Sequence, residues 1–225
     1  MKLLAIDTFS SILSLALLND NTMHYAQSET GMKHSELVMQ LTDSLCKEAG
    51  IKPFDLEGVL CMEGPGSFTG LRIGYSTAKG LALSLSIPFA AIPTFDCISH
   101  SYKESAFLLT LTDARKNAWF YAFFRDGKRH SCDSDGDMRQ IVNDLNGFKK
   151  DINEKIILAG PGAPSFFEAV LSGQKENFIF TGEKGGYAKE LIKTAQELNI
   201  FENDNSQFLI SGPSYLRKSD AELNS

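Results

Sequence analysis

The chain has 225 residues, of which 43% are hydrophobic and 22% are charged. This composition is typical of a globular protein that buries a sizeable core, and it excludes a disordered, coil-like or collagen-like chain. At roughly 150 residues per domain, the length fits one large domain or two small ones. The formal net charge of −6 excludes a basic surface overall, so a contact with RNA must be local or supplied by a partner.

Targeting and redox signals are weak in this sequence. Residues 1–6 run into Asp7 too soon for the apolar core of a signal peptide. The longest uncharged stretch, residues 80–95, is shorter than the ~20 apolar residues of a membrane-spanning helix. The four cysteines form no C-x-x-C pair for zinc or thiol exchange. We therefore expect a cytoplasmic protein that does not bind a membrane.

The N-terminal segment predicts two strands followed by a helix. Within residues 3–20, two largely apolar runs flank a polar turn at residues 7–11, which is typical of a hairpin. Residues 34–49 place Leu37 and Leu41 on one apolar helical face, and Gly50 supplies the helix end.

A strand, a tight turn and a second helix follow. The apolar run at residues 58–62 leads into the Gly-Pro-Gly turn, and a helix is expected over residues 70–86, capped by Ser67 or Thr69. Small residues recur at every fourth position of this helix, namely Gly70, Gly74, Ala78 and Ala82. Such a stripe allows another backbone to approach closely, either within the same domain or from another subunit.

The same order of features recurs in the second half. Residues 107–127 repeat the pattern of strand, Asp, polar turn and strand, with Asp113 in the place of Asp7. Residues 155–165 then repeat the strand and the Gly-Pro-Gly turn. This duplication predicts two similar domains, residues 1–103 and a smaller one at residues 104–225 that ends in a helix and a tail.

The Gly-Pro-Gly turn leaves two interpretations open. Backbone N–H groups at a helix start can hold a phosphate, and Gly64, Gly66, Ser67 and Thr69 would form such a cradle. The spacing of its glycines fits neither the dinucleotide-binding fingerprint nor the P-loop, so a structural turn that aims the helix is the competing interpretation.

Asp7 and Asp113 are the candidate acidic groups. Each ends a strand at a hairpin turn, where a carboxylate can hold a metal-bound phosphate or simply bond its own backbone. Arg115 and Lys116, next to Asp113, could meet an anionic ligand or partner. The four histidines show no metal-binding spacing, and no nucleophile motif is present, so we assign no catalytic residue and no metal ligand.

The run from Gly64 to Gly74, GPGSFTGLRIG, closely resembles the hallmark of the TsaB (YeaZ) family. The similarity extends to residues 4–8, to His34-Ser35-Glu36, to residues 113–116 and, more loosely, to residues 213–217. It is dense over residues 3–102 and sparse beyond them.

This resemblance implies an α/β fold of two actin-like (ASKHA, RNase H-like) domains, each a mixed sheet with helices. It implies a non-catalytic dimerisation subunit that supports TsaD in making threonylcarbamoyladenosine beside the anticodon of tRNA. TsaE and TsaC complete the pathway, and tRNA is met through the complex. The subunit is implied to have no cofactor of its own, with ATP or ADP placed at the complex interface.

In this family the first domains pair through their helices. We therefore expect the helices that begin near His34 and Gly70 to contact TsaD, through Leu37, Leu41 and Arg72 as well as the small-residue stripe. Without TsaD, the same face would form a homodimer. A direct tRNA contact would need a local basic patch such as Arg125, Lys128 and Arg129.

Two other functions compete with this one. A small-molecule kinase or ATPase of the actin-like superfamily would use Asp7 and both Gly-Pro-Gly turns around a nucleotide phosphate. A glycopeptidase would need metal ligands or a nucleophile, which the sequence does not provide.

Overall fold

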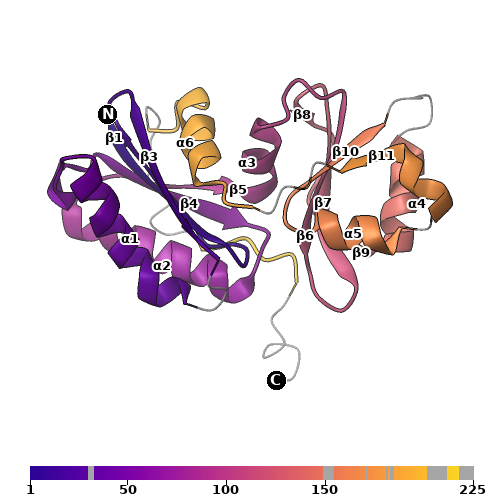
Figure 1. Cartoon of the computed structure of the whole chain (residues 1–225), viewed down its shortest axis with the longest axis horizontal. Helices are drawn as coiled ribbons and strands as arrows, with labels where there is room; N and C mark the ends of the chain where they lie inside the picture. The colour runs from indigo at the N-terminus through magenta and orange to yellow at the C-terminus, as the bar shows by residue number, and fades with distance from the viewer. Residues whose placement is uncertain are drawn as a thin grey trace. The chain divides into compact units, whose positions relative to one another are not determined.

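The computed structural model describes residues 1–29, 33–148, 155–170, 172–180, 182, 185–201 and 212–217. The chain divides into two compact units (Figure 1). The first comprises Met1–Cys97 and Gly186–Tyr215, and the second comprises Ile98–Gly185 and Leu216–Ser225.

The first unit is built on a five-stranded mixed sheet with the order β3-β2-β1-β4-β5. Its strands are β1 (Lys2–Asp7), β2 (Leu13–Asn19), β3 (Thr22–Ser28), β4 (Gly58–Gly64) and β5 (Phe89–Pro93). The expected hairpin is confirmed, because β1 and β2 pair antiparallel from Lys2 opposite Asn19 to Asp7 opposite Ser14. The strands β4 and β5 extend the sheet in the parallel direction.

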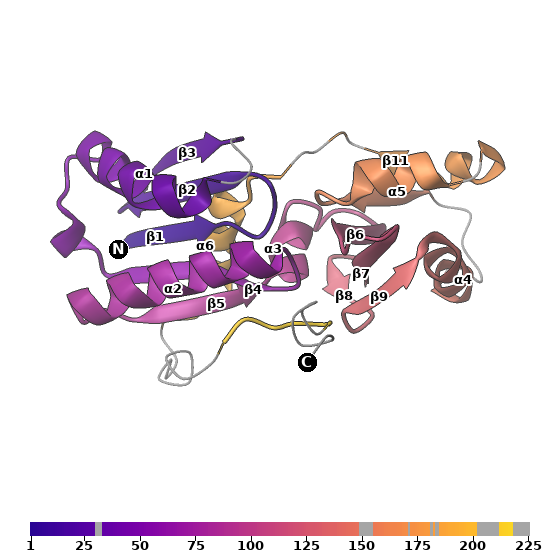
Figure 2. The same ribbon diagram turned by 90° about the horizontal axis from the view of Figure 1, so that it is seen from below.

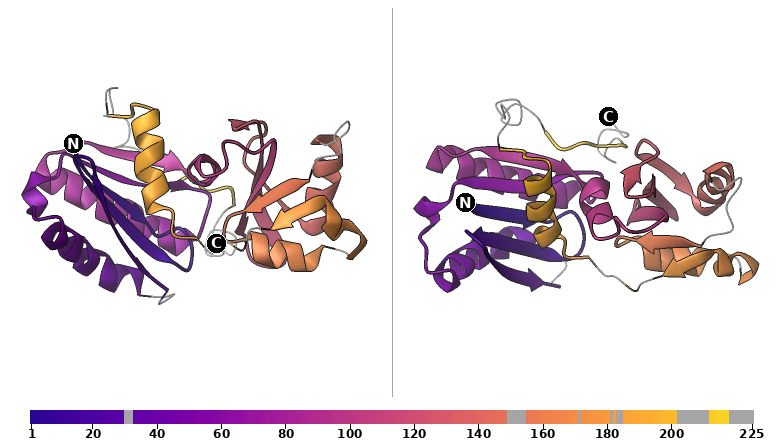
Figure 3. Two further views of the ribbon diagram at one scale, coloured as in Figure 1. Left: turned by 45° about the horizontal axis from the view of Figure 1, so that its top comes forward. Right: turned by 90° about the horizontal axis from the view of Figure 1, so that it is seen from above.

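Helices cover both faces of this sheet. The helices α1 (His34–Glu48) and α2 (Phe68–Leu85) lie side by side on one face (Figure 2). There Val38, Leu45 and Tyr75 join the buried side chains of the strands. The helix α6 (Ala188–Glu197) lies on the opposite face, as Figure 3 shows. The short helices η1 (Pro53–Asp55) and α3 (Thr94–His100) complete the first half of the chain.

The second unit repeats the strand order of the first. Its path β11-β10-β6-β7-β8 has the same order, directions and connections as β5-β4-β1-β2-β3, and β9 pairs with β7 off this path. The strands are β6 (Phe107–Asp113), β7 (Ala118–Arg125), β8 (Lys128–Arg129), β9 (Ser134–Asp137), β10 (Ile156–Ala159) and β11 (Phe178–Phe180). The predicted duplication is therefore present in the topology.

The helices of the second unit pack on one face of its sheet. They are α4 (Met138–Phe148), α5 (Ala163–Ala169) and the short η2 (Ser172–Asn177). Ile141 and Leu145 of α4 and Phe166 of α5 are buried in one core with the side chains of β6 and β7. Both units thus have a mixed sheet with helices, as expected for actin-like domains.

The observed division of the chain differs from the expected boundary between residues 103 and 104. The first unit ends at Cys97 and takes up the chain again from Gly186. The order of elements along the sequence predicts the last helix in the second domain, but α6 packs on the first sheet, where Leu191, Ile192 and Ala195 are buried. Sequence order alone does not specify which sheet an amphipathic helix covers. The polar link at residues 202–207 lies outside the described residues.

Local signals set the element boundaries well. The helix α2 begins at Phe68 rather than Gly70 because the hydroxyl of Ser67 accepts a hydrogen bond from the Gly70 N–H at 3.2 Å.

Over the described part of the chain, no helix combines the length and the apolar character that crossing a bilayer requires.

Candidate functional site

Asp7 is fully buried at the end of β1. Its Oδ2 accepts hydrogen bonds from the Ser14 hydroxyl at 2.9 Å and from the Tyr187 N–H at 2.8 Å. Its Oδ1 accepts one from the Phe9 N–H at 3.3 Å. Both carboxyl oxygens are therefore occupied by donors of the protein itself.

The start of α6 covers this carboxyl group. The Ala188 N–H donates to the Ser14 hydroxyl at 3.1 Å, so two successive backbone amides of the helix start bind the Asp7–Ser14 pair. The side chain of Tyr187 is 1% exposed and its ring lies 5.9 Å from that of Phe9. A carboxyl group at a helix start is favourable because the unpaired N–H groups point towards it.

This geometry corrects the expected role of Asp7 in contacting a phosphate. The expectation assumed an exposed turn, whereas α6 packs on that end of the strand and leaves the carboxyl group no exposed surface. Burial raises the pKa of Asp7 to about 6, although the hydrogen bonds from Tyr187, Ser14 and Phe9 oppose the shift.

The Gly-Pro-Gly turn packs against the chain itself. A Cβ on Gly66 would lie 2.9 Å from the Cβ of Phe9, and the Ser67 N–H donates to the Phe9 carbonyl at 2.8 Å. Gly64, at φ +122°, lies against the carbonyl of Ser214, whose own N–H donates to Glu63 at 2.8 Å. The glycines thus allow close backbone approach, which supports the structural interpretation of the turn over a phosphate cradle. Of the remaining cradle residues, Ser67 caps α2 and Thr69 is exposed.

The small-residue stripe of α2 faces inward. Gly70, Gly74, Ala78 and Ala82 are all buried. A Cβ on Gly70 would clash with the Thr8 carbonyl oxygen, and one on Gly74 would lie 2.5 Å from the Thr8 hydroxyl oxygen. That hydroxyl donates to the Gly70 carbonyl at 2.7 Å. The expected subunit contact through this stripe is therefore wrong. Its glycines instead leave space for Thr8, which follows β1 in the same unit.

The other expected interface residues divide between core and surface. His34 is buried, with Nε2 2.9 Å from the Ser10 carbonyl, and Leu37 and Leu41 are partly buried against the core. Arg72 is exposed at the start of α2, where its guanidinium lies 3.8 Å from the ring centroid of Phe68.

The outer surfaces of α1 and α2 carry large apolar side chains that the sequence analysis missed. Met39 of α1 is 49% exposed and Leu83 of α2 is 65% exposed. Both fall outside the predicted apolar stripes, and their position in the helical period was the signal that could have found them.

The counterpart of Asp7 in the second unit has a different environment. Asp113 is exposed, and its Oδ1 accepts a hydrogen bond from the Arg115 N–H at 2.7 Å. In the described ranges, no three His, Cys, Asp or Glu side chains gather closely enough to hold a metal ion. Cys46, Cys61 and Cys97 are buried thiols, and Cys132 is an exposed one.

Known proteins similar to this chain share its length and its fold. The family model described as "TsaD: tRNA N6-adenosine threonylcarbamoyltransferase" matches residues 17–224. The tRNA threonylcarbamoyladenosine biosynthesis protein TsaB of Bacillus subtilis is 30% identical over 99% of this chain and 96% of its own length. TsaB of Escherichia coli is 30% identical over 56% of this chain and 55% of its own length.

Solved structures agree with these relatives. YeaZ from Pseudomonas aeruginosa superposes with a TM-score of 0.72 at 19% identity, covering 96% of this chain and 99% of its own. A second Pseudomonas aeruginosa structure, described as similar to peptidase YEAZ, gives a TM-score of 0.74 at 20% identity, with the same coverage. At these identities the structures establish the fold alone.

Alanine substitutions at two glycines of α2 test the inward stripe. Gly70→Ala should lower the free energy of unfolding by about 3 kcal/mol, because the added methyl group overlaps the Thr8 carbonyl. Gly80→Ala is the matched control, since a Cβ there meets nothing within 4 Å, and it should raise stability by about 1 kcal/mol. Urea unfolding measures both, and equal effects of the two substitutions would refute the inward packing.

The buried carboxyl group predicts a pH dependence. Because the folded-state pKa of Asp7 lies above that of the unfolded chain, its stabilising contribution is complete at low pH and is lost as the pH rises through about 6. Between pH 4 and pH 7, the free energy of unfolding of the wild type should fall by about 2 kcal/mol relative to Asp7→Asn. Asp113→Asn, at the exposed counterpart, is the control. A difference that stays constant with pH, or grows, would contradict the buried position of Asp7.

Proposed function

The chain belongs to the TsaB (YeaZ) family, and on this premise we propose that it is a non-catalytic dimerisation subunit for tRNA threonylcarbamoyladenosine biosynthesis that binds TsaD. The observation that carries the proposal is the closed environment of Asp7. The alternative, a kinase or ATPase that uses Asp7 around a nucleotide phosphate, would need this strand end open to the ligand, whereas here α6 occupies it. The chain then contributes by holding TsaD, which carries out the transfer to the adenosine of tRNA.

The outer surface of α1 and α2 is the proposed TsaD-binding face. It exposes Met39 and Leu83, whose burial against a partner helix would remove apolar area from water. Arg72, held over Phe68 at the start of α2, supplies a cation at the edge of this face. The family model that matches this chain is that of the transferase, so the two partners share a fold and can pair through equivalent helices.

The remaining parts of the proposal concern the rest of the complex. The same face supports a homodimer when TsaD is absent, and TsaE joins the pair that TsaD completes. TsaC acts earlier in the same cytoplasmic pathway, and tRNA is bound by the assembled complex. ATP or ADP at the complex interface would be held by partner residues, because the carboxyl group of Asp7 is fully buried and already accepts hydrogen bonds from its own chain.

A charged side chain on the outer face of α2 tests TsaD binding. Leu83→Glu should raise the dissociation constant for TsaD at least tenfold, because it places a carboxylate in an apolar contact. Ile179→Glu on β11, where the native side chain is 45% exposed in the second unit, is the matched control. Calorimetric titration measures both constants. Undiminished binding by Leu83→Glu, or equal loss by both variants, would refute this face as the site.

Calorimetry with Mg-ATP on the isolated chain separates the proposal from a kinase or ATPase. A subunit whose Asp7 is covered should release no binding heat and turn over no nucleotide until its partners are added. Tight binding with turnover by the chain alone would favour the enzymatic alternative.

A further inference from the structure

The loop between β6 and β7 has a conformation that most residues avoid. Arg115, Lys116 and Asn117 follow one another in the left-handed region, with φ values of 61°, 56° and 56°. For Arg115 and Lys116 this region costs roughly 1–2 kcal/mol each unless local contacts hold the residue, whereas Asn adopts it more readily. Three consecutive residues in this region strain the backbone, and proteins retain such strain where a particular loop conformation is needed.

Hydrogen bonds on both sides fix this shape. The Asp113 carboxylate accepts from the Arg115 N–H at 2.7 Å, and the Ala118 N–H donates to the Arg115 carbonyl at 3.1 Å. From the C-terminal tail, Arg217 bonds to the Asp135 carboxylate and donates to the Ala114 carbonyl at 3.4 Å. The loop is therefore held in place while the side chains of Arg115 and Lys116 stay exposed.

An open cavity of about 500 Å³ borders the loop. Asn117 contributes to its wall from the loop, Arg139 from the start of α4, and Trp119 and Ser165 from β7 and α5. The indole N–H of Trp119 donates to the Ser165 hydroxyl at 2.9 Å. The cavity also borders the Asp137 carboxylate, which accepts a hydrogen bond from the Gln140 N–H at 2.9 Å. Its size is sufficient for one nucleotide.

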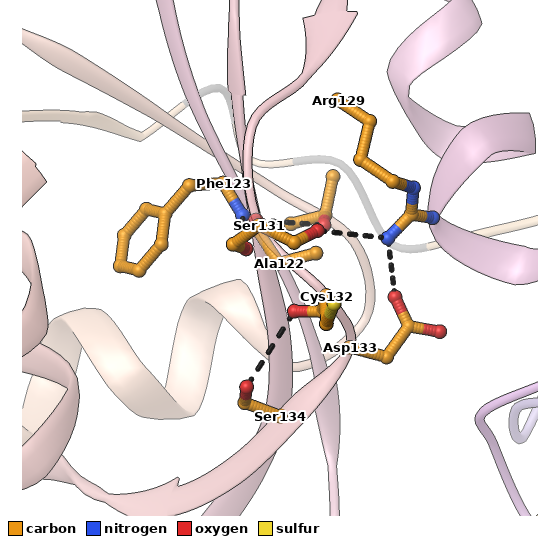
Figure 4. A network of polar contacts seen from close by, with 8 residues as sticks. Ala122, Phe123, Arg129, Ser131, Cys132, Asp133 and Ser134 are labelled. Carbon is orange, nitrogen blue, oxygen red and sulfur yellow. Dashed lines mark hydrogen bonds and ion pairs between the residues drawn. The ribbon is translucent and has the colours of Figure 1, made fainter.

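The charges beside this cavity differ from those elsewhere in the second unit. Arg129 is bound by Asp133 at 2.5 Å and by the Ser131 carbonyl at 3.4 Å (Figure 4). Arg125 lies 3.8 Å from Asp126. Within the described residues, by contrast, no ion pair joins a carboxylate to the guanidinium of Arg115 or Arg139. The basic patch expected at Arg125, Lys128 and Arg129 thus has two of its three cations paired within the chain.

We propose that the loop Asp113–Asn117 and Arg139 form a binding site for the phosphate backbone of a single-stranded RNA segment. Two guanidinium groups that have no carboxylate partner among the described residues provide the charge that phosphates need. The cavity beside them, with the Asn117 amide in its wall, accepts an unstacked base. This proposal rests on the proposed function, in which the RNA is the tRNA acted on by the complex.

A salt titration of tRNA binding by the complex of this chain with TsaD tests the site. Arg115→Ala with Arg139→Ala should weaken tRNA binding at least tenfold. The negative slope of log K against log salt concentration should decrease in magnitude by about 1.4, because two phosphate contacts with a single strand are lost. Arg115→Lys with Arg139→Lys keeps both charges and should retain the wild-type slope, which a merely structural role would not predict.

The control is Arg125→Ala with Lys128→Ala, which removes two positive charges from the far end of β7 and from the adjacent strand β8. Equal losses in the two alanine pairs, or an unchanged slope in the first, would overturn the site. The site would also be overturned if the first alanine pair kept tRNA binding and lost binding to a protein partner, because the ligand would then be an acidic peptide. Co-elution with TsaD is measured first. If the chain does not bind TsaD, the proposed function fails, and the same titration on the chain alone still decides between RNA and no RNA at this loop.

Discussion

The hydrogen bonds between the Asp7–Ser14 pair and the start of α6 are the constraint on which the first unit depends. They join residues 180 and 174 positions apart in the sequence. Because backbone amides are the donors, the helix start itself is fixed, and the opposite face of the first sheet is covered by residues from the far end of the chain. The same bonds occupy the carboxyl group that could otherwise bind a ligand.

Duplication followed by divergence accounts for the rest of the molecule. Both units keep one strand order, and in both a Gly-Pro-Gly turn lies against the end of the first strand, with Gly162 against Thr112 as Gly66 lies against Phe9. The two aspartates differ, since Asp7 is buried under α6 and Asp113 holds a strained, cationic loop at the surface. The two units also differ in what they expose: apolar side chains on α1 and α2 of the first, and charged ones on the β6–β7 loop of the second.

The sequence predicted what depends on neighbours along the chain. The hairpin around Asp7, the cap at Ser67 and the repeat at Asp113 follow from local periodicity and turn chemistry. The stripe of Gly70 and Gly74 was recognised as a site of close approach, but its partner is Thr8, more than 60 residues away, and spacing alone does not identify it. For the same reason the burial of Asp7 under α6 required the packed structure.

Hydrogen exchange at the Tyr187 amide tests the central claim most directly, because that N–H is bonded to Asp7. If the carboxyl group is held by α6, this amide should exchange only through global unfolding of the first unit, at the same rate with and without Mg-ATP. Rapid exchange in the free protein, or a rate that Mg-ATP changes, would show that the strand end opens to a ligand and would contradict the account.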